Sequence, residues 1–206
     1  MPVIDLAFEL RGAAIPLDHG YALFSALSRA VPALHGDRRI GVHPIRGMRV
    51  EPRRLTLVPG SRLRLRMPSE EIGAYLTLAG SRLDLEGSPL RVGLPRVEPL
   101  RPAPALSSRL VTIGKHAEPA AFVASLRSQM AGLGVEGELS LLPSTDPSRA
   151  GEPSRRVLRI KGRRIVGYAA AVTGLTAEGS LLLQEHGLGS RRRMGCGVFV
   201  RTGEPR

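Results

Sequence analysis

The most distinctive stretch of this chain is Glu185-His186-Gly187-Leu188-Gly189-Ser190-Arg191-Arg192-Arg193-Met194-Gly195-Cys196-Gly197-Val198-Phe199-Val200. Four glycines surround three consecutive arginines. Because glycine has no Cβ, its backbone can take positive φ, approach a ligand closely and leave N–H groups free for a phosphate. The guanidinium groups add fork-shaped donors that match phosphate oxygens. The stretch predicts an anion site for a nucleic-acid backbone, while a glycine-rich turn with solvated arginines explains the pattern equally well. The candidate ligands are Gly187, Gly189, Arg191, Arg192, Arg193 and Gly195.

The stretch does not match the common nucleotide-binding loops. Gly187-x-Gly189 places Arg192 where the dinucleotide fingerprint requires its third glycine, and Gly195-x-Gly197 places Val200 there. A Gly-Lys-Ser or Gly-Lys-Thr sequence occurs nowhere in the chain. The sequence therefore predicts neither ATP nor NAD binding.

The charge balance also favours a polyanionic partner. The chain has 206 residues, with 30 Lys and Arg against 18 Asp and Glu, which gives a formal net charge of +12. Only Lys115 and Lys161 are lysines. A GC-rich genome would explain this choice of arginine over lysine, but it would not explain the excess of basic over acidic residues.

Cys196 is the only cysteine, which excludes an intrachain disulfide and a cysteine-based zinc site. There is also no H-E-x-x-H motif or compact pair of metal ligands, so we predict no metal site and no cofactor. The N-terminus lacks a signal-peptide pattern, and no apolar run approaches the roughly 20 residues that span a bilayer. We expect a cytoplasmic protein with no membrane contact.

Hydrophobic periodicity predicts two halves with the same order of elements. In the first half we expect a helix that begins at Asp18, a good N-cap, and ends near Pro32. The expected strands of this half are residues 3–10, 39–45, 54–58, 62–67 and 82–85, with a short helix after residue 69. In the second half we expect helices from Pro119 and from Thr176. Its expected strands are residues 109–115, 137–142, 156–161 and 164–172, and one around Phe199.

The strand at residues 62–67 has the clearest alternation. Leu63, Leu65 and Met67 fall on the face predicted to be buried, which places Arg62, Arg64 and Arg66 together on the other face. A polar outer face needs no ligand, but three like charges in a row repel each other and favour an anionic partner. Arg159 and Lys161, in the hairpin predicted through Gly162, are further candidates for binding the phosphates of a nucleic acid.

Each half follows the order strand, helix, strands, helix, strand, which is typical of the split βαβ motif. We therefore predict an α+β protein of two tandem ferredoxin-like (RRM-like, βαββαβ) domains. The expected boundaries are residues 1–98 and 106–206, with a proline-rich linker at residues 99–105.

Two such halves with a Gly–Arg loop before the last strand resemble the RAMP superfamily of CRISPR-associated proteins. Within it, Asp18-His19-Gly20-Tyr21-Ala22-Leu23-Phe24-Ser25-Ala26-Leu27, followed by Leu34-His35, is similar to the first helix of the endoribonucleases that cut CRISPR repeats. The chain looks most like the compact Myxococcus-type variant of type I systems.

This resemblance implies metal-independent cleavage, in which the ribose 2′-OH attacks the adjacent phosphate and leaves a 2′,3′-cyclic phosphate and a 5′-OH. The implied partners are CRISPR repeat RNA, expected as a stem-loop, and the mature guide RNA. The resemblance leaves undecided whether other subunits of a type I complex are also partners. A non-catalytic RNA-binding subunit of an effector complex is the alternative function.

Three of the five histidines flank the first helix: His19, His35 and His43. Histidine is the side chain best suited to proton transfer near neutral pH. His35 matches the family's catalytic position, His43 is the second candidate, and His19 fits a local capping or packing role at least as well.

Several relatives place a helical tyrosine beside the catalytic histidine, and Phe24 stands at the matching position here. Arg29, Arg38 or Arg39 is expected to assist His35 instead.

A general RRM-type binder of single-stranded RNA is disfavoured by the composition. Such domains stack bases on aromatic side chains of the sheet, whereas this chain has three Tyr, four Phe and no Trp.

Overall fold

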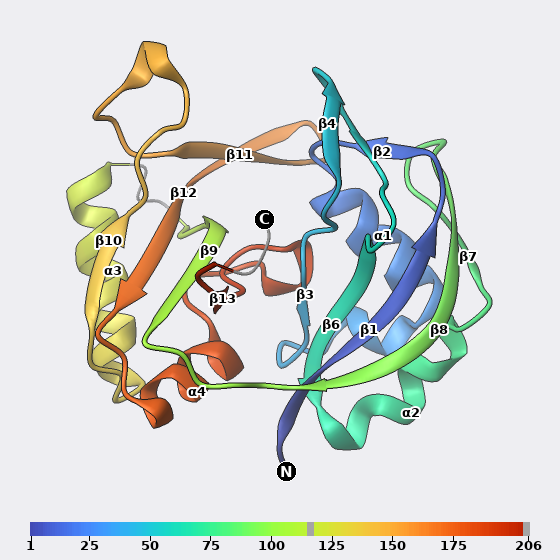
Figure 1. Ribbon diagram of the computed structural model, residues 1–206, viewed down its shortest axis with the longest axis horizontal. Helices are drawn as coiled ribbons and strands as arrows, with labels where there is room; N and C mark the ends of the chain where they lie inside the picture. Colours follow the sequence, from blue (N-terminus) through green and yellow to red (C-terminus); the bar gives the residue numbers. More distant parts are fainter. Residues whose placement is uncertain (115–117, 204–206) are drawn as a thin grey trace. The chain divides into compact units, whose positions relative to one another are not determined.

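The computed structural model describes residues 1–114 and 118–203 (Figure 1). Lys115, the last residue of one predicted strand, lies outside the described residues. The chain divides into two compact units. Unit 1 is Met1–Pro99 together with Arg193–Gly195, and unit 2 is Leu100–Arg192 together with Cys196–Arg206. The Gly–Arg loop therefore contributes residues to both units.

Unit 1 is built on a five-stranded antiparallel sheet, in which β6, β1 and β8 lie side by side (Figure 1). In sheet order its strands are β3 (Gly41–Val42), β6 (Arg62–Pro68), β1 (Val3–Arg11), β8 (Pro89–Pro99) and β7 (Arg82–Asp84). A separate small sheet joins β2 (Ala14–Pro16), β5 (Arg54–Thr56) and β4 (Met48–Glu51). The strand predicted at residues 54–58 thus belongs to this small sheet, and the strand predicted at residues 39–45 shortens to β3.

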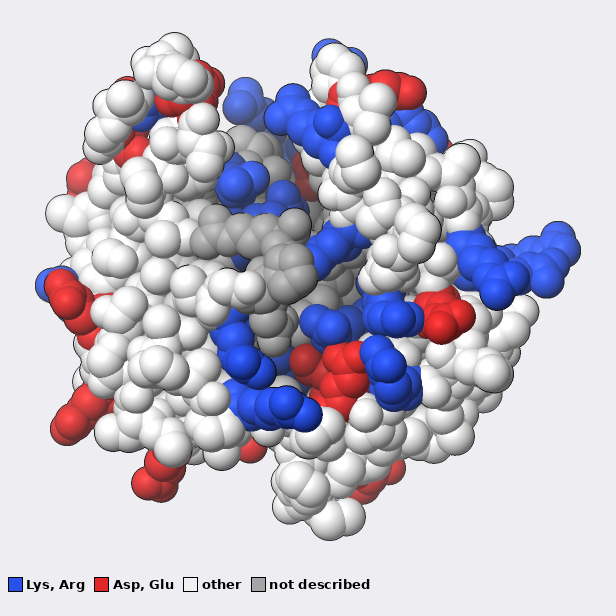
Figure 2. All heavy atoms as spheres, in the orientation of Figure 1, with Lys and Arg blue, Asp and Glu red and all other residues white. Residues whose placement is uncertain are grey.

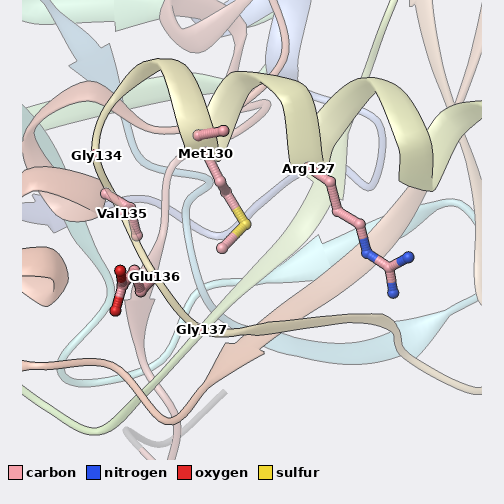
Figure 3. Close-up of a pocket in the computed structure, with 7 residues that line it drawn as sticks. Arg127, Met130, Gly134, Val135, Glu136 and Gly137 are labelled. Carbon is pink, nitrogen blue, oxygen red and sulfur yellow. The ribbon is translucent and has the colours of Figure 1, made fainter.

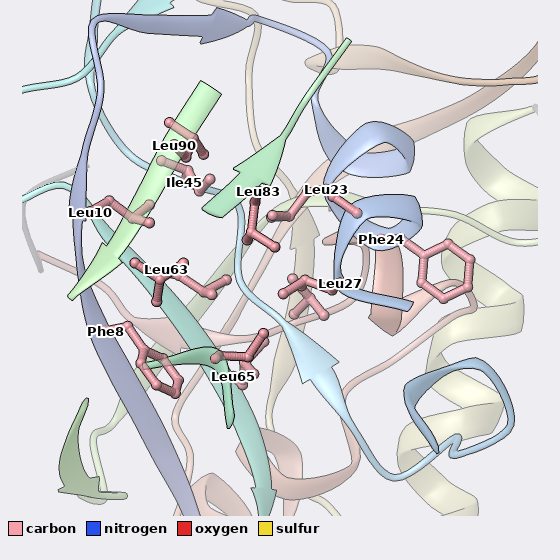
Figure 4. Packing of buried hydrophobic residues seen from close by; sticks show 14 of the residues in the cluster. Phe8, Leu10, Leu23, Phe24, Leu27, Ile45, Leu63, Leu65, Leu83 and Leu90 are labelled. Atoms are coloured by element: carbon pink, nitrogen blue, oxygen red, sulfur yellow. The ribbon is translucent and has the colours of Figure 1, made fainter. Parts of the chain in front are cut away.

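The helices of unit 1 are α1 (Gly20–Ala30) and the short α2 (Ile72–Tyr75), and 3-10 turns flank α2 at Ser69–Glu71 and Leu76–Leu78. Leu23 and Leu27 of α1 are buried against strand residues such as Leu63, as their spacing predicts (Figure 4). Phe24 points to a different side of α1 (Figure 4). The predicted N-cap Asp18 is wrong by one residue, since α1 has His19 at this position, with no hydrogen bond from its side chain to the helix.

Unit 2 repeats the plan of unit 1. In sheet order its strands are β10 (Glu138–Leu141), β12 (Arg163–Thr173), β9 (Ala105–Val111) and β13 (Val200–Arg201), and β11 (Arg155–Ile160) also pairs with β12. Its helices are α3 (Pro119–Gly132) and α4 (Ala177–His186). Thr176 caps α4 by accepting from the N–H of Gly179 at 3.0 Å. The predicted hairpin is confirmed, and it turns through Lys161 and Gly162 at φ 46° and 79°.

Both main sheets place the third strand of a βαββαβ unit beside the first, and the first beside the fourth. The predicted α+β fold of two tandem ferredoxin-like domains is therefore confirmed. In the described part of the chain, no helix has the length and apolar content needed to cross a bilayer.

The segment between β8 and β9 is held within unit 2. The backbone N–H of Ala103 donates to Ser180 Oγ of α4 at 3.0 Å. Gln184 Nε2 of the same helix donates to the carbonyl of Arg101 at 2.9 Å. The proline-rich segment predicted as a linker is thus hydrogen-bonded to α4 at Arg101 and Ala103.

The predicted alternation of β6 is confirmed on one face only. Leu63, Leu65 and Met67 are fully buried. The expectation that all three arginines lie exposed is wrong for Arg66, which is only 2% exposed. Its guanidinium makes a two-pronged ion pair with Asp5 of β1, at 2.8 Å from Nε and 2.9 Å from Nη2.

The other two arginines of β6 also face carboxylates. Arg64 pairs with Glu98 of β8 at 3.0 Å, and Arg62 lies 3.7 Å from Glu9 of β1. The repulsion expected within the row is therefore offset by acidic residues on the neighbouring strands, and β6 does not require an anionic ligand.

We predict that Arg66→Met destabilises the fold far more than Arg62→Met, the same substitution on the same strand. Arg66→Met leaves the Asp5 carboxylate buried without its guanidinium, which costs about 3–5 kcal/mol. Arg62→Met removes an exposed pair worth about 1 kcal/mol or less. Urea unfolding of the three proteins measures both losses. Equal losses would show that the buried pair contributes no more than a surface pair.

Candidate active site

His35 ends a 3-10 turn, η1 (Pro32–His35), that directly follows α1. Pro32 begins the turn, where its missing N–H costs no hydrogen bond. Leu34 is fully buried and anchors the turn in the core of unit 1, while His35 is exposed. The backbone N–H groups of Gly36 and Asp37 donate to the carbonyl of Ala33 at 3.3 Å. A regular turn with an apolar anchor thus presents this histidine at the surface.

Three rings follow one another along this part of unit 1. The imidazole of His35 lies against Phe24 with ring centroids 5.8 Å apart and an angle of 32° between the planes. Phe24 in turn contacts Tyr21 of the same helix, at 6.5 Å between centroids. Phe24, at the position where the resemblance led us to expect a tyrosine, therefore supports the histidine ring and offers no proton of its own.

Arg193 of the Gly–Arg loop reaches the same turn. Its Nη1 donates to the carbonyl of Leu34 at 3.1 Å and also to the carbonyl of His35. Its guanidinium carbon lies 5.6 Å from the centroid of the Phe24 ring. The sequence predicted a phosphate ligand here and missed this contact, because no local pattern connects residues so far apart in the chain.

The arginines expected to assist His35 differ in their surroundings. Arg39 bonds to Asp37, with 2.8 Å between Nη2 and Oδ2, and to Glu71. The hydrogen bond from Arg39 lowers the pKa of Asp37. Arg29 donates to Ser25 Oγ at 2.8 Å. Arg38 is exposed, and no ion pair is found for it within the described residues. Of the three arginines expected to assist His35, it is therefore the one best placed to contact a bound anion.

His43 lies in the interior of unit 1, only 5% exposed. Its Nε2 lies 3.2 Å from Asp5 Oδ1, so the same carboxylate bonds to His43 and to Arg66. Burial lowers the pKa of His43 from 6.5 to about 4, although the charge of Asp5 favours the protonated ring. Burial also raises the pKa of Asp5, but His43 and Arg66 outweigh it and hold that pKa well below its usual range.

His19 is also buried, at 2% exposed, and both of its ring nitrogens are engaged. Nδ1 lies 3.1 Å from the carbonyl of Pro16, and Nε2 accepts from the N–H of Ile45 at 3.0 Å. Since an accepting Nε2 requires the proton on Nδ1, the ring is neutral and links the end of β2 to the segment after β3. Of the three candidate histidines, only His35 is exposed, which favours it as the proton-transfer residue.

The loop glycines have the predicted positive φ, with values of 64° at Gly187, 83° at Gly189, 80° at Gly195 and 66° at Gly197. The expectation that their N–H groups point freely at phosphate is wrong for three of them. Gly187 donates to Leu183 at 2.9 Å, Gly189 to Gln129 Oε1 at 2.7 Å, and Gly197 to Leu110 at 2.8 Å.

The close approach that these glycines permit is to the chain itself. A Cβ on Gly189 would lie 2.6 Å from the carbonyl oxygen of Thr112 and 2.7 Å from Val111 Cγ1. The N–H of Ser190 donates to the same carbonyl of Thr112 at 2.8 Å. These contacts fix Gly189 and Ser190 at the end of β9, and the next residue, Arg191, bonds to Ser190 Oγ at 2.9 Å. Arg192 is half-buried.

The β11–β12 hairpin is the most basic element of unit 2. Arg159 faces Arg164 directly across the two strands, and Lys161 is exposed in the turn. The hairpin contains no Asp or Glu, and its basic residues are Arg155, Arg156, Arg159, Lys161, Arg163 and Arg164. Figure 2 shows Lys and Arg side chains on one face of the molecule, several of them beside Asp or Glu.

Two other features offer no competing site. No three His, Cys, Asp or Glu side chains gather as a metal site requires within residues 1–114 and 118–203. A pocket of unit 2 lies at the end of α3, and no histidine lines it (Figure 3). Its lining residues are Arg127, Met130, Ala131, Gly134, Val135, Glu136 and Gly137.

We predict that stability falls between pH 6.5 and pH 4 because of His43. Its pKa in the folded protein is about 4 against 6.5 as the ordinary value, so in this window the unfolded chain binds more protons. One such proton changes the free energy of unfolding by up to about 1.4 kcal/mol per pH unit. His43→Gln keeps an N–H near Asp5 and cannot titrate, so urea unfolding at several pH values should give a flatter slope. The same slope in both proteins would contradict a neutral, buried His43.

Comparison with known proteins identifies the family. The Cas6 family model, described as Cas6 Crispr, matches residues 4–203. The CRISPR-associated endonuclease Cas6 of Myxococcus xanthus is 40% identical over 203 residues, which cover 98% of this chain and 83% of that protein.

Solved structures agree at the level of fold. A CRISPR-associated protein Cas6 superposes with a TM-score of 0.72 at 13% identity, covering 97% of this chain and 99% of the other. A Cas6-related protein from Pyrococcus furiosus gives 0.70 at 13% identity, with 98% and 100% covered. Thermus thermophilus Cse3, solved with an RNA that represents a pre-cleavage complex, gives 0.50 at 19% identity, with 97% and 98% covered. The resemblance inferred from the sequence is confirmed, and the chain belongs to the Cas6 family of CRISPR-associated proteins.

Proposed function

We propose that this protein is a metal-independent endoribonuclease that cuts CRISPR repeat precursor RNA into mature guide RNAs, with His35 as its proton-transfer residue. The observation that carries the proposal is the position of His35 in a Cas6-family chain. It is the exposed one of the three candidate histidines, and it lies beside Phe24 and Arg193. Membership of the family supports the activity, since the relative from Myxococcus xanthus is named an endonuclease.

The chemistry needs little more than these groups. The ribose 2′-OH loses its proton and attacks the adjacent phosphorus, the bond to the 5′-oxygen breaks, and that oxygen gains a proton. The products carry a 2′,3′-cyclic phosphate and a 5′-OH. An exposed imidazole can remove the first proton or supply the second. Arg38 keeps its charge throughout and would stabilise the negative charge that builds up on the phosphate oxygens.

The test of this activity is incubation with the repeat RNA of the same genome in EDTA, followed by analysis of the product ends. Cleavage with a 2′,3′-cyclic phosphate on one product and a 5′-OH on the other supports the proposal. Binding without cleavage supports the alternative, a non-catalytic RNA-binding subunit of an effector complex. Cleavage that EDTA abolishes would contradict the metal-independent mechanism.

We predict that His35→Ala cuts the repeat about 10²–10⁴-fold more slowly in single-turnover assays, because it lacks the group that moves a proton. Its affinity for the RNA should stay close to normal, since binding depends on the arginines. His186→Ala, another exposed histidine of the same chain, is the matched control and should cut normally.

His43→Ala and His19→Ala are made alongside, with folding checked first because both histidines are buried. If His35→Ala cuts at the wild-type rate while folded His43→Ala is inactive, the catalytic role moves to His43. If all the histidine variants cut normally, histidine catalysis is wrong for this protein.

We predict that the β11–β12 hairpin binds RNA phosphates through Arg159 and Lys161. A double substitution, Arg159→Ala with Lys161→Ala, should weaken binding and reduce the slope of log affinity against log salt. The reduction is about 0.7 per lost phosphate contact for single strands and about 0.9 for duplex-like RNA. Arg127→Ala, an exposed arginine of α3, is the control. An unchanged slope in the double variant would place the hairpin outside the RNA interface.

A further inference from the structure

We infer that Arg193 is a positioning residue for His35, although its place among three arginines of the Gly–Arg loop suggests a phosphate ligand. The inference rests on the proposed function, since it gives Arg193 a part in the reaction that His35 performs. It concerns contacts within unit 1 only, because Arg193 and His35 both belong to that unit.

The first contact fixes the backbone that carries the histidine. Arg193 Nη1 donates to the carbonyl of Leu34 at 3.1 Å and to the carbonyl of His35. These are the last two carbonyls of η1, and the last carbonyls of a helical turn have no donor within it. A cation at this end also meets the negative end of the turn's dipole. The guanidinium therefore completes the turn at the residue that presents the imidazole.

The second contact fixes the ring against which the imidazole lies. The guanidinium carbon of Arg193 is 5.6 Å from the centroid of Phe24, and the His35 ring is 5.8 Å from the same centroid. A guanidinium over an aromatic face is attracted by the ring quadrupole. Arg193 thus contacts both the backbone of His35 and the ring that limits the side-chain rotation of His35.

The neighbours of Arg193 hold it in place for this role. Met194 packs against the core of unit 1. A Cβ on Gly195 would lie 3.3 Å from the ring of Pro44, so Gly195 lies close to the segment that follows β3. Asp37 lies near enough that the charge of Arg193 contributes to lowering its pKa, after the larger effect of Arg39. With carbonyls, an aromatic face and a carboxylate around it, the guanidinium is already occupied without RNA.

Such positioning has a direct kinetic consequence. General acid–base catalysis requires the imidazole within hydrogen-bond reach of the proton that it moves. A displacement of about 1 Å can cost on the order of 10²-fold in rate. Loss of Arg193 should therefore slow the chemical step, whereas loss of a simple phosphate contact should weaken binding.

The experiment compares Arg193→Met with wild type and with Arg82→Met, an exposed arginine of β7 in the same unit. Methionine keeps much of the side-chain length without the donors or the charge. Each protein is assayed for repeat-RNA affinity and for its single-turnover cleavage rate at saturating RNA. Hydrogen exchange of the RNA-free protein reports on the amides of Leu34, Gly36 and Asp37, whose hydrogen bonds define the turn.

We expect Arg193→Met to cut about 10–100-fold more slowly at saturation, with an affinity within about threefold of wild type and faster exchange in the turn. Arg82→Met should match wild type in all three measurements. Weak binding with wild-type cleavage at saturation and unchanged exchange would overturn the inference and make Arg193 a phosphate ligand. Arg193→Lys, which keeps the charge but not the two-pronged donor geometry, serves if the methionine variant does not fold, and should also show faster exchange.

Failure of the proposed function gives a different result. If the wild-type protein does not cut, or if His35→Ala cuts normally, the catalytic role of His35 is wrong whatever Arg193 does. Exchange in the turn then decides the contact by itself. Faster exchange in both Arg193 variants supports the contact between Arg193 and the carbonyls of Leu34 and His35. Exchange equal to wild type overturns it.

Discussion

The buried ion pair between Asp5 and Arg66 constrains the whole of unit 1. Two charges without free access to water are tolerated only when they are closely paired and fully hydrogen-bonded. The carboxylate of Asp5 receives both prongs of the guanidinium, and its Oδ1 also bonds to His43. As a result, β1 and β6 are linked by more than their backbone ladder. His43 bonds to the same carboxylate, while its burial lowers its pKa to about 4. The same pair removes Arg66 from the RNA-binding candidates, because its guanidinium has no access to a ligand.

The glycines of the Gly–Arg loop impose a second constraint, which concerns the chain and not the ligand. At Gly189 a side chain would meet the backbone of Thr112, and the N–H group is already bonded to Gln129. Gly189 and Ser190 are therefore fixed beside α3 and at the end of β9, so this part of the loop holds the neighbouring Arg191 without offering the amide of Gly189 to an anion. The amides of Gly187, Gly189 and Gly197 are all bonded within the chain, and of the three arginines of the loop Arg193 is already bonded within unit 1.

Local patterns in the sequence predict the fold well, because they record which side of an element is buried. The spacing of Leu23 and Leu27 gives the inner face of α1, and the alternation of β6 gives Leu63 and Leu65 as core residues. The same patterns cannot identify partners that lie far away in the chain. Arg66 and its carboxylate are 61 residues apart, and Arg193 and the carbonyl of His35 are 158 apart. The candidate site depends on such long-range contacts, so the sequence predicted its residue types but not which side chains face solvent.

These contacts also change the meaning of the net charge. A formal charge of +12 counts every arginine equally, but an arginine bonded to a carboxylate presents little field to an approaching polyanion. The arginines of β6 face Asp5, Glu9 and Glu98, so that strand is nearly neutral as a surface. The β11–β12 hairpin has six basic residues and no acidic one, which equals half of the net charge of the chain. Arg159 and Arg164 face each other across this hairpin, and like charges directly opposite each other repel. The hairpin that we propose as an RNA-binding element therefore belongs to unit 2, while the groups that we propose for cleavage belong to unit 1.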